Sequence, residues 1–372
     1  MTTTTRALGD ALHERAIETT GFDDFGDDGY QEGLFRLIDE LVAAMGDDAE
    51  TVAARLASAP LAGRLRSQEQ WRRHPDVLRR ELPGPLVITG LPRTGTTALH
   101  RLLAFDDRFQ VLQHWIQHHP MPRPERARWE HEAAYQEAVS VYEAMPEVLR
   151  VTHLVEPTEA EECLALMAQS FTSNLFGSGV ILPEYDEWFL GQTMEPSFRR
   201  YADNLRLVGA HDDRPWLLKN PSHVLALDEL FAVFPDAVVV QTHRKPLDAI
   251  GSVVSLLSEL YQGDPHPRAA RELRVWGEGA ARADAQRDVR PEQFVDVDYR
   301  ELVADPFAAV VAVYRQLGLE ISPALADCVR AGIAANPQHK HGQHSYDPAA
   351  LGVTEDAIEE HFGAYIARHH LG

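Results

Sequence analysis

The 372-residue sequence predicts an α/β fold of three layers, in which a central, mostly parallel five-stranded sheet is flanked by helices. Three observations predict it: short apolar segments, helical patterns between most of them, and a glycine-bearing loop directly after the first. Strands that alternate with helices imply right-handed crossovers, which produce a parallel sheet. An apolar content of 44% is sufficient for a large buried core.

The apolar segments are predicted to be strands that are buried on both faces. They lie at residues 86–89, 109–113, 215–219, 237–243 and 293–299. The helical patterns that separate most of them include residues 97–105, 158–175, 222–233, 246–260 and 306–317. Such sheets bind ligands at the carboxyl ends of their strands, so we expect the site residues just after these segments.

Helical sequence precedes and interrupts this core. Residues 1–83 are expected to form an N-terminal helical extension packed on the core, because apolar side chains between Leu34 and Met45 recur at helical spacing. A proline–glycine pair then marks the start of the main domain, residues 84–372. Within this domain, residues 114–214 form a long insertion that is rich in helical patterns and aromatic side chains.

Charge and cysteine content limit the classes of partner. A formal net charge of −22 repels polyphosphate, so nucleic acid is not expected as a partner. No apolar run approaches the ~20 residues that span a bilayer, and the N-terminus has no apolar signal core. Cys163 and Cys328 lie far apart and indicate neither a disulfide framework nor a metal pair, so a cytoplasmic location is expected. The sequence neither supports nor excludes a homo-oligomer.

The loop after the first strand has the form of a phosphate cradle. Residues 86–97 are LVITGLPRTGTT, and a helical pattern follows at once. In such a turn, backbone N–H groups and a helix N-terminus converge on an anion. Gly90 and Gly95 have the spacing of the nucleotide-binding motif G-x-x-x-x-G-K-[ST]. Thr96 replaces the lysine of that motif, however, and Arg93 stands two residues before the second glycine.

A second set of polar residues follows the strand at 237–243. Arg244 comes directly after this strand, and Ser252 lies eight residues later in the following helical pattern. Pro246 suits the first turn of that helix, where a missing N–H costs little. Because the planar fork of arginine matches tetrahedral oxyanions, Arg244 and Ser252 can hold one anion from two sides.

These motifs resemble those of the sulfotransferases that use 3′-phosphoadenosine 5′-phosphosulfate (PAPS) as donor. The 5′-phosphosulfate loop of that family has the form P-[KR]-[ST]-G-T-T and is similar here to Pro92, Arg93, Thr94, Gly95, Thr96 and Thr97. The family's 3′-phosphate motif, an arginine and a serine eight residues apart, resembles Arg244 and Ser252.

Two later segments extend the resemblance. Tyr299, in VDYRELVADP, resembles a Y-x-x-L…P stretch of the family. Lys340, His341 and Gly342 resemble its late basic-glycine loop over the nucleotide, with the usual R-K-G altered. The resemblance covers roughly residues 84–346 and is closest to a bacterial branch of the family.

The resemblance implies a P-loop-like sulfotransferase fold and an enzyme that transfers a sulfuryl group from PAPS to a hydroxyl of a small organic acceptor, leaving 3′,5′-ADP. The loop amides and Arg93 would stabilise the charge on the leaving phosphate, and Lys219, at a strand end, would hold the bridging oxygen or the sulfuryl group. A single phosphosulfate linkage needs no Mg²⁺ bridge, so no metal is expected. Residues 114–214 would then form a lid on the acceptor side.

The acceptor hydroxyl also needs a base, because an unactivated alcohol is a poor nucleophile. The family uses a histidine or a glutamate after the first helix and second strand, and the bacterial branch usually has a Trp-Glu pair there. This chain has Trp115 and Ile116 instead, and an isoleucine cannot take a proton. The first candidate is therefore His114, and the further candidates are Glu159, Glu161, Glu162 and His153.

The sequence leaves two alternatives open. The first is a P-loop kinase that uses ATP, which predicts a lysine beside Gly95 and an acidic Mg²⁺ ligand at a neighbouring strand end. The second is a catalytically silent nucleotide- or lipid-binding protein on the same fold, which Ile116 favours.

Overall fold

The computed structural model describes residues 2–145, 156–335 and 346–372. The chain divides into two compact units. The helical unit contains residues 1–82 and 112–213, and the sheet unit contains residues 83–111 and 214–372. Almost all of the predicted insertion therefore falls into the helical unit, together with the N-terminal segment.

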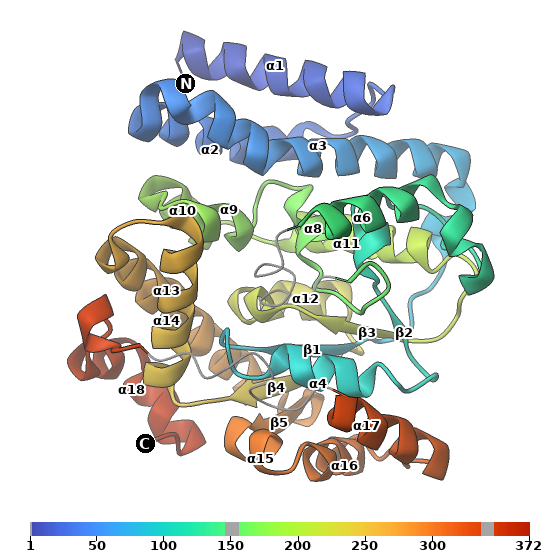
Figure 1. The fold of residues 1–372 in the computed structure, drawn as a ribbon, viewed down its shortest axis with the longest axis vertical. Coiled ribbons are helices and arrows are strands. Elements are labelled where there is room, and N and C mark those ends of the chain that lie inside the picture. Colours follow the sequence, from blue (N-terminus) through green and yellow to red (C-terminus); the bar gives the residue numbers. More distant parts are fainter. Residues whose placement is uncertain (1, 146–155, 336–345) are drawn as a thin grey trace. The chain divides into compact units, whose positions relative to one another are not determined.

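The sheet unit is built on five parallel strands in the order β2-β3-β1-β4-β5 (Figure 1). The strands are β1 (Leu86–Gly90), β2 (Gln110–Val111), β3 (Trp216–Lys219), β4 (Val238–His243) and β5 (Phe294–Asp298). Each lies within a predicted segment or extends it by one residue, so the predicted sheet and the α/β class are confirmed.

Helices cover both faces of this sheet. On one face lie α4 (Thr96–Leu103), α16 (Pro306–Gln316) and α17 (Pro323–Ala335), whose apolar side chains share one core with the strands. On the other side lie α12 (Leu227–Val233) and α14 (Pro265–Val289), as Figure 1 shows. The 3₁₀ turn Pro221–Leu225 packs against β1 and α14. Against α14 pack α13 (Pro246–Tyr261) and α18 (Glu355–His369).

All five strands are parallel, but the side of the sheet on which the chain adds strands changes between β1 and β4. These strands are neighbours, but β1 leads towards β2 at one edge of the sheet and β4 leads to β5 at the other. Open α/β sheets bind ligands at the carboxyl ends of their strands where such a reversal occurs. Gly90 pairs with Thr242 at this end, which places the phosphate-cradle loop beside the segment that carries Arg244.

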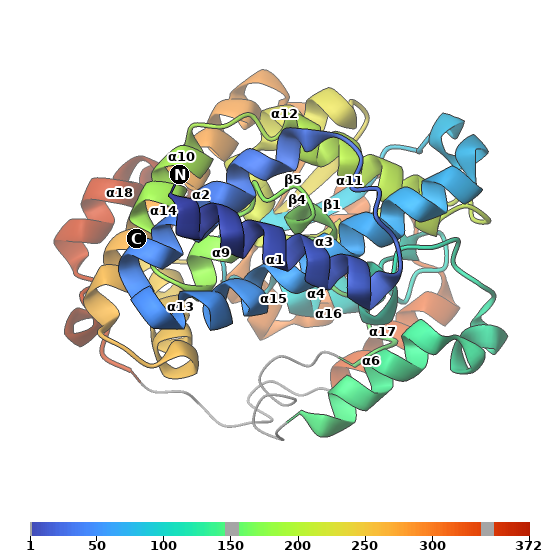
Figure 2. The same ribbon diagram turned by 90° about the horizontal axis from the view of Figure 1, so that it is seen from above.

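The helical unit begins with three helices that pack against one another (Figure 1 and Figure 2). They are α1 (Thr3–Thr20), α2 (Gln31–Met45) and α3 (Ala49–Arg73). The predicted apolar face of α2 is fully buried at Leu34, Leu37, Ile38 and Leu41. The longer of the remaining helices are α6 (Ala133–Ala144), α10 (Pro183–Leu190) and α11 (Glu195–Val208). In the described parts of the chain, no helix has both the length and the apolar character of a membrane span.

The helix predicted over residues 158–175 is wrong in its first half. Ala160 forms an antiparallel bridge with Gln113, and the Glu161 N–H donates to the carbonyl of Leu112 at 2.8 Å. These bonds to another segment replace the local ones that a helix would make. Helices occupy only the later part of the segment, at α8 (Leu164–Ala168) and, beyond it, α9 (Asn174–Gly179).

Candidate functional site

The phosphate-cradle loop has a backbone that its glycines make possible. Gly90 has a φ of 143°, and a Cβ there would lie 2.5 Å from the carbonyl oxygen of Thr242. Gly95 has a φ of 89°, in the left-handed region that glycine enters without steric cost. Between them, Arg93 adopts a φ of 63°. A non-glycine residue in this region is uncommon, and such residues gather at functional sites.

The loop ends on the N-terminus of α4. Gly95 is the capping residue and offers no side chain to the first turn, so the N–H groups that begin at Thr96 keep their capacity for an anion. Thr94 is fully buried, and its hydroxyl donates to the carbonyl of Leu91 at 2.6 Å. This bond turns the Thr94 side chain into the protein. Pro92 and Thr96 are also buried, whereas Thr97 is exposed.

Arg93, Arg244 and Ser252 meet on one side of this loop. The Arg93 Nε–H donates to Ser252 Oγ at 3.2 Å. An Arg244 N–H donates to the backbone carbonyl of Arg93 at 2.8 Å. The Arg244 guanidinium also lies over the ring of Tyr299, 4.5 Å from its centroid. The structure thus brings together four residues that the sequence analysis assigned to the donor site.

Two positive charges are close together in this cluster. Partial burial lowers the pKa of Arg93 below its usual value, and the neighbouring charge of Arg244 lowers it further. Among the described residues, neither guanidinium forms an ion pair with a carboxylate. Cations held close together without a counter-charge favour the binding of an anion.

Lys219 approaches the same loop from β3. It is 1% exposed, and its Nζ donates to Thr97 Oγ1 at 3.1 Å. Its charge acts on the buried His100, whose pKa falls to about 3 because of burial first and Lys219 second. His100 is therefore neutral at pH 7 and adds no charge beside Lys219.

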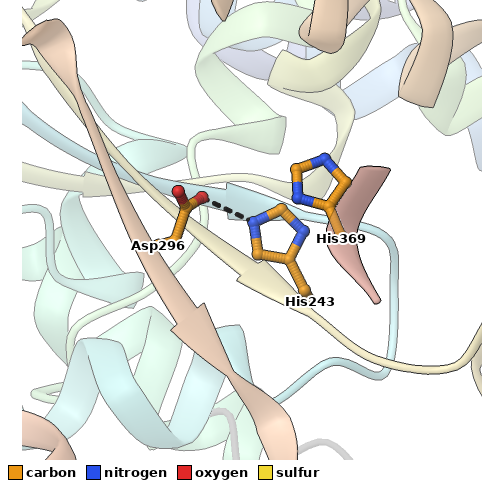
Figure 3. A group of neighbouring side chains, drawn as sticks. All are labelled: His243, Asp296 and His369. Carbon is orange, nitrogen blue, oxygen red and sulfur yellow. Dashed lines mark hydrogen bonds and ion pairs between the residues drawn. The ribbon is translucent and has the colours of Figure 1, made fainter. Parts of the chain in front are cut away.

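A histidine pair supports the end of β4 and was not indicated by any motif (Figure 3). His243 Nε2 lies 2.7 Å from Asp296 Oδ1, and the rings of His243 and His369 stack with centroids 4.0 Å apart. The Tyr365 hydroxyl lies 2.8 Å from His243 Nδ1. These contacts from β5 and α18 fix the backbone from which Arg244 projects. Burial lowers the pKa of His243 despite the carboxylate beside it.

The same group is a possible metal site by residue type alone. Potential ligand atoms of His243, Asp296 and His369 all lie within 4.8 Å of one another. The two imidazole planes are only 21° apart, however, and stacked rings do not direct their lone pairs at one ion. Asp296 also pairs with Arg287 at 2.7 Å, and His369 bonds to Asp284 at 2.8 Å. The arrangement is that of a hydrogen-bonded support and does not fit a metal centre.

The candidate bases lie in the helical unit. The bridge between Gln113 and Ala160 brings His114 beside Glu161, with 3.8 Å between His114 Nδ1 and Glu161 Oε2. The His114 backbone N–H donates to the carbonyl of Glu159 at 3.2 Å. Burial lowers the pKa of His114 below 6.5, so its imidazole is neutral at pH 7 and can accept a proton.

Glu162 is half-buried, and its backbone N–H donates to Glu161 Oε1 at 2.8 Å. The remaining residues of the sequence analysis are either buried in the core or lie outside the described residues. Trp115 is 1% exposed and Ile116 is fully buried, so both side chains belong to the core. The other positions lie outside the described residues: His153, Lys340, His341 and Gly342.

Comparisons with known proteins identify chains that are similar to this one. The model of the sulfotransferase family matches residues 85–323. The curated omega-hydroxy-beta-dihydromenaquinone-9 sulfotransferase Stf3 of Mycobacterium bovis is 27% identical over 305 residues, which cover 77% of this chain and 74% of the relative.

Solved structures are similar over nearly the whole chain. The sulfotransferase STF1 of Mycobacterium tuberculosis H37Rv has a TM-score of 0.84 and 34% identity, covering 95% of this chain and 98% of that one. The sulfotransferase STF9 of Mycobacterium avium has a TM-score of 0.88 and 22% identity, covering 96% of each chain. Because STF9 is only 22% identical, its similarity supports a shared fold and nothing more.

Proposed function

Since the chain belongs to the sulfotransferase family, we propose that it transfers a sulfuryl group from PAPS to a hydroxyl of a small organic acceptor and releases 3′,5′-ADP. The observation that carries the choice of donor is the cluster of Arg93, Arg244 and Ser252 beside the phosphate-cradle loop. PAPS presents two separate anionic groups, a 3′-phosphate and a 5′-phosphosulfate. The cluster and the loop offer one binding element for each.

Each element has a role in donor binding. Arg244 and Ser252 bind the 3′-phosphate, and the Arg244 guanidinium rests over the ring of Tyr299. The backbone N–H groups of residues 94–97 bind the 5′-phosphosulfate at the N-terminus of α4. Arg93 links the two elements, because its backbone belongs to the loop and its side chain reaches Ser252. From the family resemblance alone, Lys340, His341 and Gly342 are also proposed to bind the nucleotide.

The transfer breaks one bond to sulfur as another forms. The acceptor oxygen bonds to sulfur, the bond between sulfur and the bridging oxygen breaks, and that oxygen leaves on the 5′-phosphate of 3′,5′-ADP. Negative charge grows on the leaving phosphate, where loop N–H groups and Lys219 stabilise it. The hydrogen bond to Thr97 holds the Lys219 ammonium in place at the loop.

The acceptor proton must go to a base as the new bond forms. We propose His114 for this role, because its lowered pKa keeps the imidazole neutral at pH 7. Glu161, 3.8 Å away, then stabilises the imidazolium. Glu159, whose carbonyl holds the His114 backbone, is the second candidate.

The acceptor is proposed to be an organic hydroxyl compound held by residues 114–214. The relative from Mycobacterium bovis supports this class, because its name specifies a hydroxylated menaquinone. The aromatic side chains of this segment suit an apolar molecule with one reactive hydroxyl. The segment is thereby proposed as the acceptor lid of the 84–372 domain.

The donor assignment is tested by nucleotide binding. Titration with 3′,5′-ADP should raise the melting temperature, and radiolabelled PAPS should transfer its sulfuryl group to members of a panel of phenols and alcohols. The variant R244A should weaken 3′,5′-ADP far more than 5′-AMP. The exposed arginine of α17, replaced in R330A, is the matched control and should change neither affinity. Stabilisation by ATP or GTP with none by 3′,5′-ADP would overturn the proposal.

A further inference from the structure

The phosphate-cradle loop packs on one residue of the neighbouring strand β4, Thr242, to which the sequence analysis gave no role. Thr242 is fully buried and pairs with Gly90, where the loop begins. A Cβ at Gly90 would lie 2.6 Å from Thr242 Oγ1, so only a glycine allows this approach. Further along the loop, Thr94 Oγ1 also lies 2.6 Å from Thr242 Oγ1. Thr242 therefore contacts both the beginning and the middle of the loop.

The hydroxyls of Thr94 and Thr242 form a hydrogen-bonded chain that ends on the loop backbone. Thr94 donates its only hydroxyl proton to the carbonyl of Leu91 at 2.6 Å, because a carbonyl only accepts. In the bond between the two hydroxyls, Thr242 is therefore the donor and Thr94 the acceptor. The other acceptor near Thr242, the carbonyl of Thr89, is farther away at 3.4 Å. Both protons are thus used within the protein, and the chain is complete without a nucleotide.

This chain spans the strained part of the loop. The bond from Thr94 to Leu91 closes over Pro92 and Arg93, and Arg93 is the residue with a φ of 63°. An L-residue enters this region at a cost and stays there only where its surroundings fix it. Thr94 and Thr242 are both fully buried, so water cannot replace their bonds. Loss of the Thr242 hydroxyl would leave Thr94 without its donor and would loosen the turn that contains Arg93.

We propose that Thr242 is a positioning residue of the donor site, which holds the phosphate-cradle loop in its anion-binding conformation through Thr94. This inference rests on the proposed function and adds to it a fully buried residue that does not bind the nucleotide itself. Because the loop binds the 5′ end, the effect concerns every nucleotide that carries a 5′-phosphate. The Arg93 carbonyl accepts a hydrogen bond from Arg244, so part of the effect also reaches the 3′-phosphate.

The test measures the affinities for 5′-AMP and 3′,5′-ADP by calorimetry at fixed salt, below the unfolding transition of each variant. The variant T242V keeps the shape of the side chain and removes the hydroxyl. It should weaken 5′-AMP by about 3- to 10-fold, which is what one hydrogen bond contributes, and 3′,5′-ADP at least as much. The conservative variant T242S keeps the hydroxyl and should restore the wild-type affinities.

A buried hydroxyl elsewhere in the sheet unit provides the matched control. Tyr314 in α16 is 2% exposed, and its hydroxyl donates to Asp106 at 2.6 Å. Y314F should therefore keep both nucleotide affinities. An equal loss in Y314F would show that any missing buried hydroxyl weakens the site, and it would overturn the positioning role of Thr242.

A double variant tests whether Thr242 acts through Thr94. If the two hydroxyls belong to one chain, T94V/T242V should bind 5′-AMP about as tightly as T94V alone. If the two single effects multiply instead, Thr242 acts by another route and the proposal is wrong.

The variant R244A separates failure of this inference from failure of the proposed function. R244A should weaken 3′,5′-ADP far more than 5′-AMP. If it does, and T242V binds both nucleotides as the wild type does, the role of Thr242 is wrong and the proposed function stands. If T242V weakens 5′-AMP but R244A leaves 3′,5′-ADP unchanged, the 3′-phosphate assignment is wrong and the role of Thr242 in the loop stands. A wild-type protein that binds neither nucleotide would overturn both.

Discussion

Replacing Gly95 by alanine tests the packing under the phosphate-cradle loop. Gly95 has φ 89° and ψ 7°, a left-handed conformation that costs an L-residue about 1–2 kcal/mol. The new Cβ would lie 2.8 Å from Leu302 Cδ2 and 3.2 Å from Tyr299 Cδ2. Overpacking of this kind costs about 1–3 kcal/mol. Together, G95A should lower the free energy of unfolding of the sheet unit by about 2–5 kcal/mol.

Gly318 provides a matched control for this variant. It also has a positive φ, 66°, but a Cβ there would meet nothing within 4 Å. G318A should therefore show only the backbone cost of about 1–2 kcal/mol. Urea unfolding gives both values, because the midpoint moves with stability while the slope stays constant. Equal destabilisation by the two variants would refute the argument that Gly95 is required by Leu302 and Tyr299.

The same variant should also affect nucleotide binding. The Cβ of G95A pushes against Tyr299, which lies under the Arg244 guanidinium. We therefore expect weaker binding of 3′,5′-ADP by G95A and unchanged binding by G318A, each measured by calorimetry below its unfolding transition. Wild-type affinity in folded G95A would show that Tyr299 does not support Arg244 in the way described.

Three further predictions follow from the geometry. K219M should lower kcat by about 10²- to 10³-fold with little change in the affinity for 3′,5′-ADP, as expected for a group that acts mainly on the transition state; equal losses in both would contradict this. If His114 is the base, it must be neutral to act, and its pKa is lowered, so kcat/KM should decrease only when the pH is brought below 6.5. H114Q should remove this acidic limb of the pH profile and lower the rate by about 10²- to 10⁴-fold. H131Q, at an exposed histidine of the same unit, should do neither. The free energy of unfolding should decrease below pH 6.5, because burial lowers the pKa of His100 and of His223 to about 3 and the unfolded chain binds protons first; each contributes about 1.4 kcal/mol per pH unit, and urea unfolding of H223N should show a shallower dependence.

The strands and the cradle loop could be predicted from the sequence because their signals are local. Five short apolar segments indicated the sheet, and the spacing of Gly90 and Gly95 located the turn. The same reasoning placed a helix over residues 158–175, where part of the segment instead bonds to residues 112–115. A pairing between two segments about fifty residues apart leaves no periodic pattern in the sequence. The prediction therefore followed the local helical pattern of residues 158–175.

The cluster around Arg244 could be predicted only in part. Arg93, Arg244 and Ser252 belong to two motifs, whereas His369 and Tyr346, whose hydroxyl donates to the carbonyl of Asp248 in α13 at 2.9 Å, belong to none. Their roles come from contacts that α13 and β4 make with distant segments. A glycine before Ser252 was the one available signal for Tyr346, because it marks a place where another residue comes close to the helix.

The distance along the chain between the partners of the donor site has a consequence for folding. The bond from Arg93 to Ser252 joins residues 159 positions apart, and the bond from Lys219 to Thr97 joins residues 122 positions apart. Such contacts close long loops, so they are completed only when β1, β3 and β4 have all docked. A nucleotide that binds there recognises the assembled sheet and stabilises it by mass action, by about 2.7 kcal/mol at a hundred times its Kd. Substitutions deep in the sheet unit can therefore appear as losses of nucleotide affinity without touching any residue that binds the nucleotide.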